Sequence, residues 1–269
     1  MLPFLQYMIL DNPLTGVIFI TYTDIQKRIR KRKLRFKIIL IIMLISAAVV
    51  FLFEKPVLKV ADISVSGNNT IEAKRIVDLS GIKIGDNLLR MNTYAIKKNI
   101  LGNSYISDCK IKRNLLGSVR IMVEERKSVC IVKFENKYLI LDRNGVVMDI
   151  IDRNNNIKLP MLTGLGIKSI EKNKVIDIND ERQLDTLKII FDSITRYNLS
   201  GIINEVDIKN LLSIYIKTNY NVDVLIGTTE NIDNKLYQAR TIIEKDLKGK
   251  GLKGTLDVSF DGNPVFKPD

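Results

Sequence analysis

The chain has 269 residues and a net charge of +12, from 42 Lys and Arg against 30 Asp and Glu. It contains no histidine and only two cysteines, Cys109 and Cys130, which excludes Ser/His/Asp and Cys/His catalysis and leaves no ligand set at zinc-site spacing. Roughly 210 residues follow its most apolar segment, enough for one large or two small domains.

That apolar segment runs from Ile38 to Phe53 and carries no charge. As a helix it measures roughly 24 Å, somewhat less than the hydrocarbon core of about 30 Å. A buried core helix normally keeps a polar face and this segment has none, so we predict a transmembrane helix at residues 38–53. A cleavable signal peptide is the alternative, but no small-x-small cleavage site follows the apolar run, which favours an uncleaved anchor.

A dense basic flank precedes the predicted span, with eight Lys and Arg between residues 27 and 37. The positive-inside rule places residues 1–37 in the cytoplasm and everything after Phe53 outside it. The charges nearest the span are expected to set this topology: Lys31, Arg32, Lys33, Arg35 and Lys37. Beside an apolar span, anionic lipid headgroups explain such a flank better than nucleic acid, so we expect a lipid contact and no nucleic-acid partner.

Residues 57–127 read as one compact module. A half-buried strand ends at Gly67, and Thr70 can cap a helix that Gly81 stops. Asn92 or Thr93 can cap a second short helix, and two strands follow. The predicted order is therefore strand, helix, helix, strand, strand.

This order and three motifs resemble the POTRA module of the FtsQ/DivIB family of bacterial division proteins. The motifs are Val-x-x-Ile-x-Val-x-Gly-Asn at 60–68, Gly-Asp-Asn-Leu at 85–88 and Val-Arg-Ile-x-Val-x-Glu-Arg-Lys-Ser-Val at 119–129. One departure is Leu116-Gly117, where the family usually has proline. The resemblance implies an α+β fold with a single transmembrane helix, a β-α-α-β-β POTRA module and a strand-rich α+β domain.

The strand-rich domain is predicted at residues 128–262, with residues 263–269 as a C-terminal tail. Asn144-Gly145 marks a tight hairpin, and Asp180 with Gln183 resembles a capping box for a helix that ends at Gly201. Apolar residues at helical spacing predict another helix over 232–247, and alternation predicts a last strand over 255–260.

Enzymatic chemistry finds little support in the sequence, and we expect neither catalytic activity nor a cofactor. Two Ser-x-x-Lys pairs occur, at Ser107–Lys110 and Ser169–Lys172, but the Lys-Thr-Gly motif that accompanies them in penicillin-binding enzymes is missing. The cysteines allow either a disulfide or two buried reduced thiols.

The resemblance implies binding to small bitopic partners of the FtsL and DivIC/FtsB types at the septum, and a septal penicillin-binding protein is a further candidate partner. In the family the closing strand is the contact, and strand addition to an exposed edge supplies a mechanism. The matching residues are Thr255, Leu256, Asp257, Val258, Ser259, Phe260 and Asp261. The alternative is that Leu256, Val258 and Phe260 only pack inward.

We therefore expect a non-enzymatic, membrane-anchored scaffold of cell division that helps control septal peptidoglycan synthesis. The alternative is a POTRA-containing component of protein transport or secretion.

Overall fold

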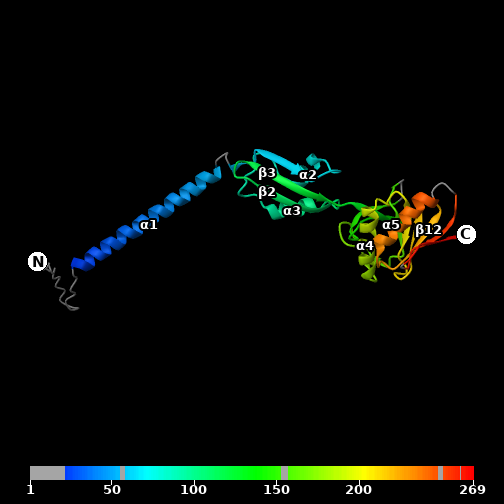
Figure 1. Ribbon diagram of the computed structural model, residues 1–269. Helices are drawn as coiled ribbons and strands as arrows, with labels where there is room; N and C mark the ends of the chain where they lie inside the picture. The colour runs from blue at the N-terminus through cyan, green and yellow to red at the C-terminus, as the bar shows by residue number, and fades with distance from the viewer. Residues whose placement is uncertain (1–21, 55–57, 153–156, 248–250, 261) are drawn as a thin grey trace. The chain divides into compact units, whose positions relative to one another are not determined.

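The structure is a computed structural model of the chain (Figure 1). It describes residues 22–54, 58–152, 157–247, 251–260 and 262–269. These form two compact units. The first comprises the described residues up to Asp62 with Lys83–Met91 and Arg113–Val119; the second comprises Ile63–Ile82, Asn92–Lys112 and Arg120–Asp269. Because the units do not divide the chain at residue 127, the boundary between residues 57–127 and 128–262 remains a prediction.

Helix α1 (Tyr22–Glu54) has 33 residues and is therefore about 50 Å long. Its segment Gln26–Phe51 contains an 18-residue window with a mean hydropathy of 2.5 and is long and apolar enough to cross a membrane. The predicted span at 38–53 lies within α1. The basic residues 27–37 belong to the same uninterrupted helix, so the charges and the apolar run share one rigid axis.

The predicted strand, helix, helix, strand, strand order is confirmed. The elements are β1 (Asp62–Ser66), α2 (Ala73–Ser80), α3 (Thr93–Leu101), β2 (Ile106–Arg113) and β3 (Ser118–Glu125), and the sheet order is β1-β3-β2. Gly81 ends α2 in the left-handed conformation, at φ 70°, as expected. Asn92 caps α3, because its Oδ1 accepts the N–H groups of Tyr94 and Ala95, each at 3.1 Å.

The expectation that Thr70 caps α2 is wrong. Glu72 occupies the N-cap of α2 and makes no side-chain cap. The carboxylate of Glu125, at the end of β3, instead accepts the N–H groups of Asn69, Thr70 and Ile71, each at 2.9 Å. Burial of this carboxylate acts to raise its pKa, but the hydrogen bonds outweigh burial and lower the pKa below the usual value. The glutamate of the Glu-Arg motif therefore fixes the turn before α2.

A nine-stranded sheet forms the larger part of the second unit, in the order β14-β13-β12-β11-β10-β7-β4-β5-β6. Its strands are β4 (Ser128–Phe134), β5 (Lys137–Asp142), β6 (Val147–Ile151), β7 (Met161–Thr163), β10 (Ile203–Asp207), β11 (Ile214–Thr218), β12 (Val222–Gly227), β13 (Gly254–Asp257) and β14 (Val265–Pro268). β7 runs parallel to β4 and β10, β13 runs parallel to β12, and the other pairs are antiparallel. A separate pair is formed by β8 (Ile167–Ser169) and β9 (Asp177–Ile178).

Two helices bury their apolar residues against this sheet. Leu187 and Phe191 of α4 (Arg182–Arg196) and Leu236 and Ala239 of α5 (Ile232–Ile242) share one core with side chains of the strands. α5 continues into a π-helical turn, Ile243–Leu247. The Asn144-Gly145 hairpin between β5 and β6 is present, with Gly145 at φ 73°.

The predicted start and end of the helix at 182–196 need correction. Gln183 makes no capping box, because its side chain accepts the N–H of Gly166 at 3.0 Å and donates to the carbonyl of Gly164 at 2.8 Å. The helix ends at Arg196, before the predicted Gly201. At the start of the helix, the tertiary contacts of Gln183 prevail over the capping-box signal. At its end, Tyr197 is the C-cap, before Gly201 is reached.

We predict that Glu125→Gln lowers the free energy of unfolding by about 1 kcal/mol near neutral pH, the size of a lost cap. A carboxylate whose folded pKa is lowered contributes stability above its unfolded pKa of about 4.3 and loses it as pH falls through the folded value. The difference from the native chain should therefore shrink in acid. Urea unfolding of the full chain in detergent at several pH values measures it, with the exposed neighbour in Glu124→Gln as the control. Equal effects of the two substitutions would contradict this role.

Candidate partner-binding site

The strand predicted to close the sheet lies inside it. β13 pairs in parallel with β12, from Val222↔Gly254 to Leu225↔Asp257, and antiparallel with β14, from Gly254↔Pro268 to Asp257↔Val265. Both backbone edges of β13 are therefore occupied, and the expectation that it offers an exposed edge is wrong. The predicted tail at 263–269 contains the strand that covers it.

Some side chains of the predicted contact point into the core, and others lie at the surface. Leu256 and Val258 are 1% and 2% exposed and belong to the core, as the inward-packing alternative held. Phe260 is 46% exposed, so its ring is available at the surface. Thr255, Asp257 and Ser259 are half-buried, and Asp261 lies outside the described residues.

Asp257 stabilises the chain where it leaves β13. Its Oδ1 accepts hydrogen bonds from the hydroxyl of Ser259 at 2.7 Å and from the N–H of Ser259 at 3.0 Å. Burial acts to raise the pKa of Asp257, but these bonds and the nearby Lys267 lower it below the usual value. The ammonium of Lys267, on β14, lies 3.8 Å from Asp257 Oδ2, so the two side chains form an ion pair between the strands.

Gly254 permits the close approach of β14. A Cβ at this position would lie 2.2 Å from the carbonyl oxygen of Lys267 and 2.8 Å from Cα of Pro268. The three atoms nearest to such a Cβ all belong to β14, so a side chain at position 254 would press against β14. The close approach of the last two strands therefore depends on a glycine.

Comparisons with known proteins bear on this arrangement. Residues 58–126 match the family model for the FtsQ-type POTRA domain. The chain is 34% identical to the cell division protein DivIB of Clostridium botulinum strain Hall, over 91% of this chain and 96% of that protein. It is also 35% identical to DivIB of Clostridium acetobutylicum, over 78% of this chain and 83% of that protein. DivIB of Bacillus subtilis strain 168 is 30% identical over 45% of this chain and 48% of that protein.

The chain belongs to the DivIB/FtsQ family of cell division proteins. The resemblance drawn from the motifs at 60–68, 85–88 and 119–129 is thereby confirmed, as is the α+β fold with an apolar helix, a POTRA domain and a strand-rich region. Membership of this family shows that the chain has a role in cell division.

The Ser-x-x-Lys pairs of this DivIB/FtsQ member are engaged in other contacts. Ser107 Oγ donates to the carbonyl of Glu124 at 2.9 Å, and Ser169 Oγ bonds Asp177 Oδ2 at 3.1 Å. Lys172 forms an ion pair with Asp149 at 2.6 Å. In the described part of the chain, no group of three or more His, Cys, Asp or Glu side chains is placed to hold a metal ion.

Both cysteines are buried free thiols, which decides between the two alternatives left open by the sequence. Burial raises the pKa of the Cys130 thiol, and it also raises that of Cys109. Both are therefore protonated and unreactive near neutral pH.

A buried ion pair near the start of β4 has no counterpart in the sequence-based prediction. Arg126 Nη1 lies 2.8 Å from Asp142 Oδ2, and the two side chains are 16% and 5% exposed. The other carboxylate oxygen of Asp142 accepts the N–H groups of Asn144 and Val146, each at 2.8 Å. Asp142 thus links the Arg of the Glu-Arg motif to the hairpin that follows β5.

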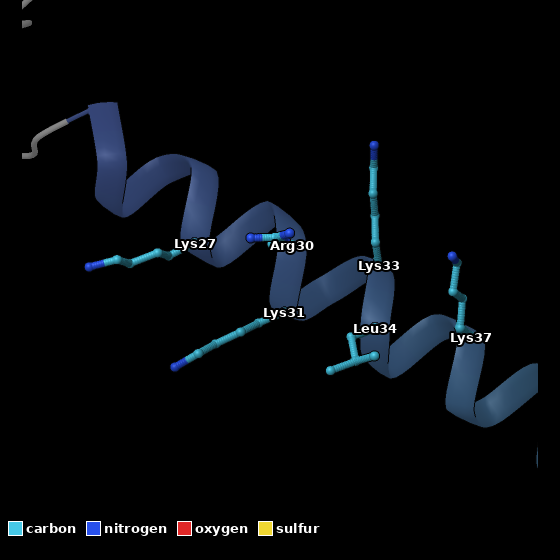
Figure 2. A pocket seen from close by; sticks show the side chains of 6 residues that line it. All are labelled: Lys27, Arg30, Lys31, Lys33, Leu34 and Lys37. Carbon is cyan, nitrogen blue, oxygen red and sulfur yellow. The ribbon is translucent and has the colours of Figure 1, made fainter. Parts of the chain in front are cut away.

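The predicted topology residues divide between two faces of α1. Lys31, Lys33 and Lys37 line a groove of about 510 Å³ together with Lys27, Arg30 and Leu34 (Figure 2). Arg32 and Arg35 do not line it. The sequence showed the density of charge but not this division.

We predict that Gly254→Ala loosens β14, because φ at this position is 155° and the three atoms nearest to the added methyl group all belong to β14. The amides of Val265, Phe266 and Lys267 should exchange with deuterium at least about ten-fold faster, a loss of about 1.4 kcal/mol in local stability. Gly201→Ala is the matched control, because its methyl group would meet no atom within 4 Å. Unchanged exchange in β14 of the Gly254 variant would contradict the prediction.

Proposed function

We propose that this chain is a non-enzymatic scaffold of the division machinery that binds FtsL-like and DivIC/FtsB-like bitopic partners and helps control septal peptidoglycan synthesis. Membership of the DivIB/FtsQ family supports a role in division, and the anchor helix supports action at a membrane. The transport alternative gains no such support, because the relatives named above are all cell division proteins.

The proposal rests on how the nine-stranded sheet ends at β13 and β14. β13 is held on one side by β12 and covered on the other by β14, a strand of four residues. Val265, Lys267 and Pro268 of β14 are exposed, and only Phe266 is half-buried. Strand replacement therefore removes little apolar contact from the core, while a partner segment recovers the same backbone hydrogen bonds.

We propose that a partner strand takes the place of β14 on β13. The residues predicted for partner binding, Thr255–Asp261, would then pair through their backbone, as the resemblance implies. Pro268 and Lys267 on β14 are residue types that protect sheet edges from unspecific pairing. They favour a role of β14 in covering β13 over a role as the strand that binds the partner.

Phe260 would supply the side-chain contact of the complex. Its ring follows the turn that Asp257 and Ser259 stabilise, and it is nearly half exposed. Aromatic anchors of this kind carry much of the energy of protein interfaces.

We further propose that the basic end of α1 lies in the cytoplasm, that the residues after α1 lie outside it, and that the chain acts at the septum. The eight Lys and Arg at residues 27–37 favour this orientation by the positive-inside rule.

Co-purification of the full chain with co-expressed FtsL-like and DivIC-like partners in detergent tests the proposal. Phe260→Ala should weaken partner binding by about ten-fold. Removal of residues 263–269, which takes away β14 alone, should preserve or strengthen binding.

Leu212→Ala serves as a control for Phe260→Ala, because Leu212 is exposed and lies outside β13 and β14. Loss of binding on removal of residues 263–269 would contradict strand replacement and make β14 itself the docking strand. A wider deletion of residues 255–269 is uninformative, since it removes Leu256 and Val258 from the core.

A further inference from the structure

The groove on α1, which we call the lysine groove, is lined by Lys27, Arg30, Lys31, Lys33, Leu34 and Lys37 (Figure 2). Successive residues of an α-helix are about 100° apart, which places these six on one side of α1. Lys27 with Lys31 and Lys33 with Lys37 are neighbours at i, i+4. Figure 2 shows the two lysine pairs pointing to different sides of the groove, with Leu34 between them.

The cations of the lysine groove lack acidic partners among the described side chains. None of the ion pairs formed between described side chains includes a residue of α1. Like charges at i, i+4 repel one another, so each lysine pair weakens the helix unless an anion lies between its ammonium groups. The groove therefore has two cation pairs available to negatively charged ligands.

An apolar row continues from the floor of the lysine groove into the predicted span. Leu34, Ile38, Ile41 and Ile45 follow at i, i+4, i+7 and i+11 and so lie along one line of the helix surface. Their exposed fractions are 58%, 48%, 54% and 58%. A ligand held by the lysines can thus lay a long hydrocarbon chain along the same face of α1.

We propose that the lysine groove binds an anionic phospholipid with two phosphates, of the diphosphatidylglycerol class, in the leaflet where α1 leaves the hydrocarbon at its N-terminal end. Each lysine pair holds one phosphate, Arg30 lies between them, and acyl chains follow Leu34 and Ile38. The two separate cation pairs favour two phosphates over one, and the apolar row favours a lipid over a soluble anion. This site goes beyond partner binding and does not depend on it.

The helix offers a matched control for this proposal. Arg28, Arg32 and Arg35 recur at i, i+4 and i+7 on a different side of α1 and do not line the groove. Lys27→Gln with Lys31→Gln and Lys33→Gln removes three charges from the groove. Arg28→Gln with Arg32→Gln and Arg35→Gln removes three from the other side. Both triple variants keep five of the eight basic residues, so topology should be retained.

The full chain is reconstituted in nanodiscs that contain phosphatidylcholine with either diphosphatidylglycerol or phosphatidylglycerol at equal total charge. Lipid retained after transfer to detergent is then counted by mass spectrometry. We expect the native chain to retain diphosphatidylglycerol in preference to phosphatidylglycerol. The groove variant should retain at least about five-fold less diphosphatidylglycerol than the native chain. The control variant should retain less than about two-fold less.

Three results would overturn the proposal. Equal losses in the two triple variants would mean that net charge alone attracts lipid, and equal retention of the two anionic lipids would remove the need for two phosphate positions. Displacement of the lipid by a single-stranded oligonucleotide at micromolar concentration would make the groove a nucleic-acid site instead.

Discussion

The parallel pairing of β13 with β12 determines where the large sheet can end. A parallel pair needs a crossover connection, and α5 with its π-helical extension supplies it between Ile232 and Leu247. β13 is thereby placed inside the sheet, with Leu256 and Val258 in the core. The chain then turns back as β14, so this edge of the sheet is a short, largely exposed strand.

Local signals in the sequence predicted the structure correctly where a residue interacts with residues next to it in the chain. Asn92 caps the helix that follows it, Gly81 ends another in the left-handed conformation, and Asn144-Gly145 forms its hairpin. Each of these depends on the conformation of a few consecutive residues. The strand and helix order of the POTRA domain followed from such signals together with the family motifs.

The same signals failed where a distant group competes for the same atoms. The N–H groups near Thr70 are taken by Glu125, 55 residues later, and Gln183 binds the backbone of Gly164 and Gly166. β14 was missed because four residues that end in Lys-Pro carry little strand signal, and its pairing depends on close approach to Gly254, which is distant in the sequence. Burial of Leu256 and Val258 followed from alternation, but the loss of the exposed edge did not.

A reversible lock between β13 and β14 tests strand replacement most directly. Thr255 and Lys267 lie opposite each other in the antiparallel pair, so cysteines at both positions can form a disulfide, and the native Cys109 and Cys130 are buried. In the full chain carrying Thr255→Cys and Lys267→Cys, oxidation should weaken binding of the DivIC-like partner at least about ten-fold, and a reductant should restore it. Equal affinity of the oxidised and reduced forms would show that β14 stays in place and contradict the account.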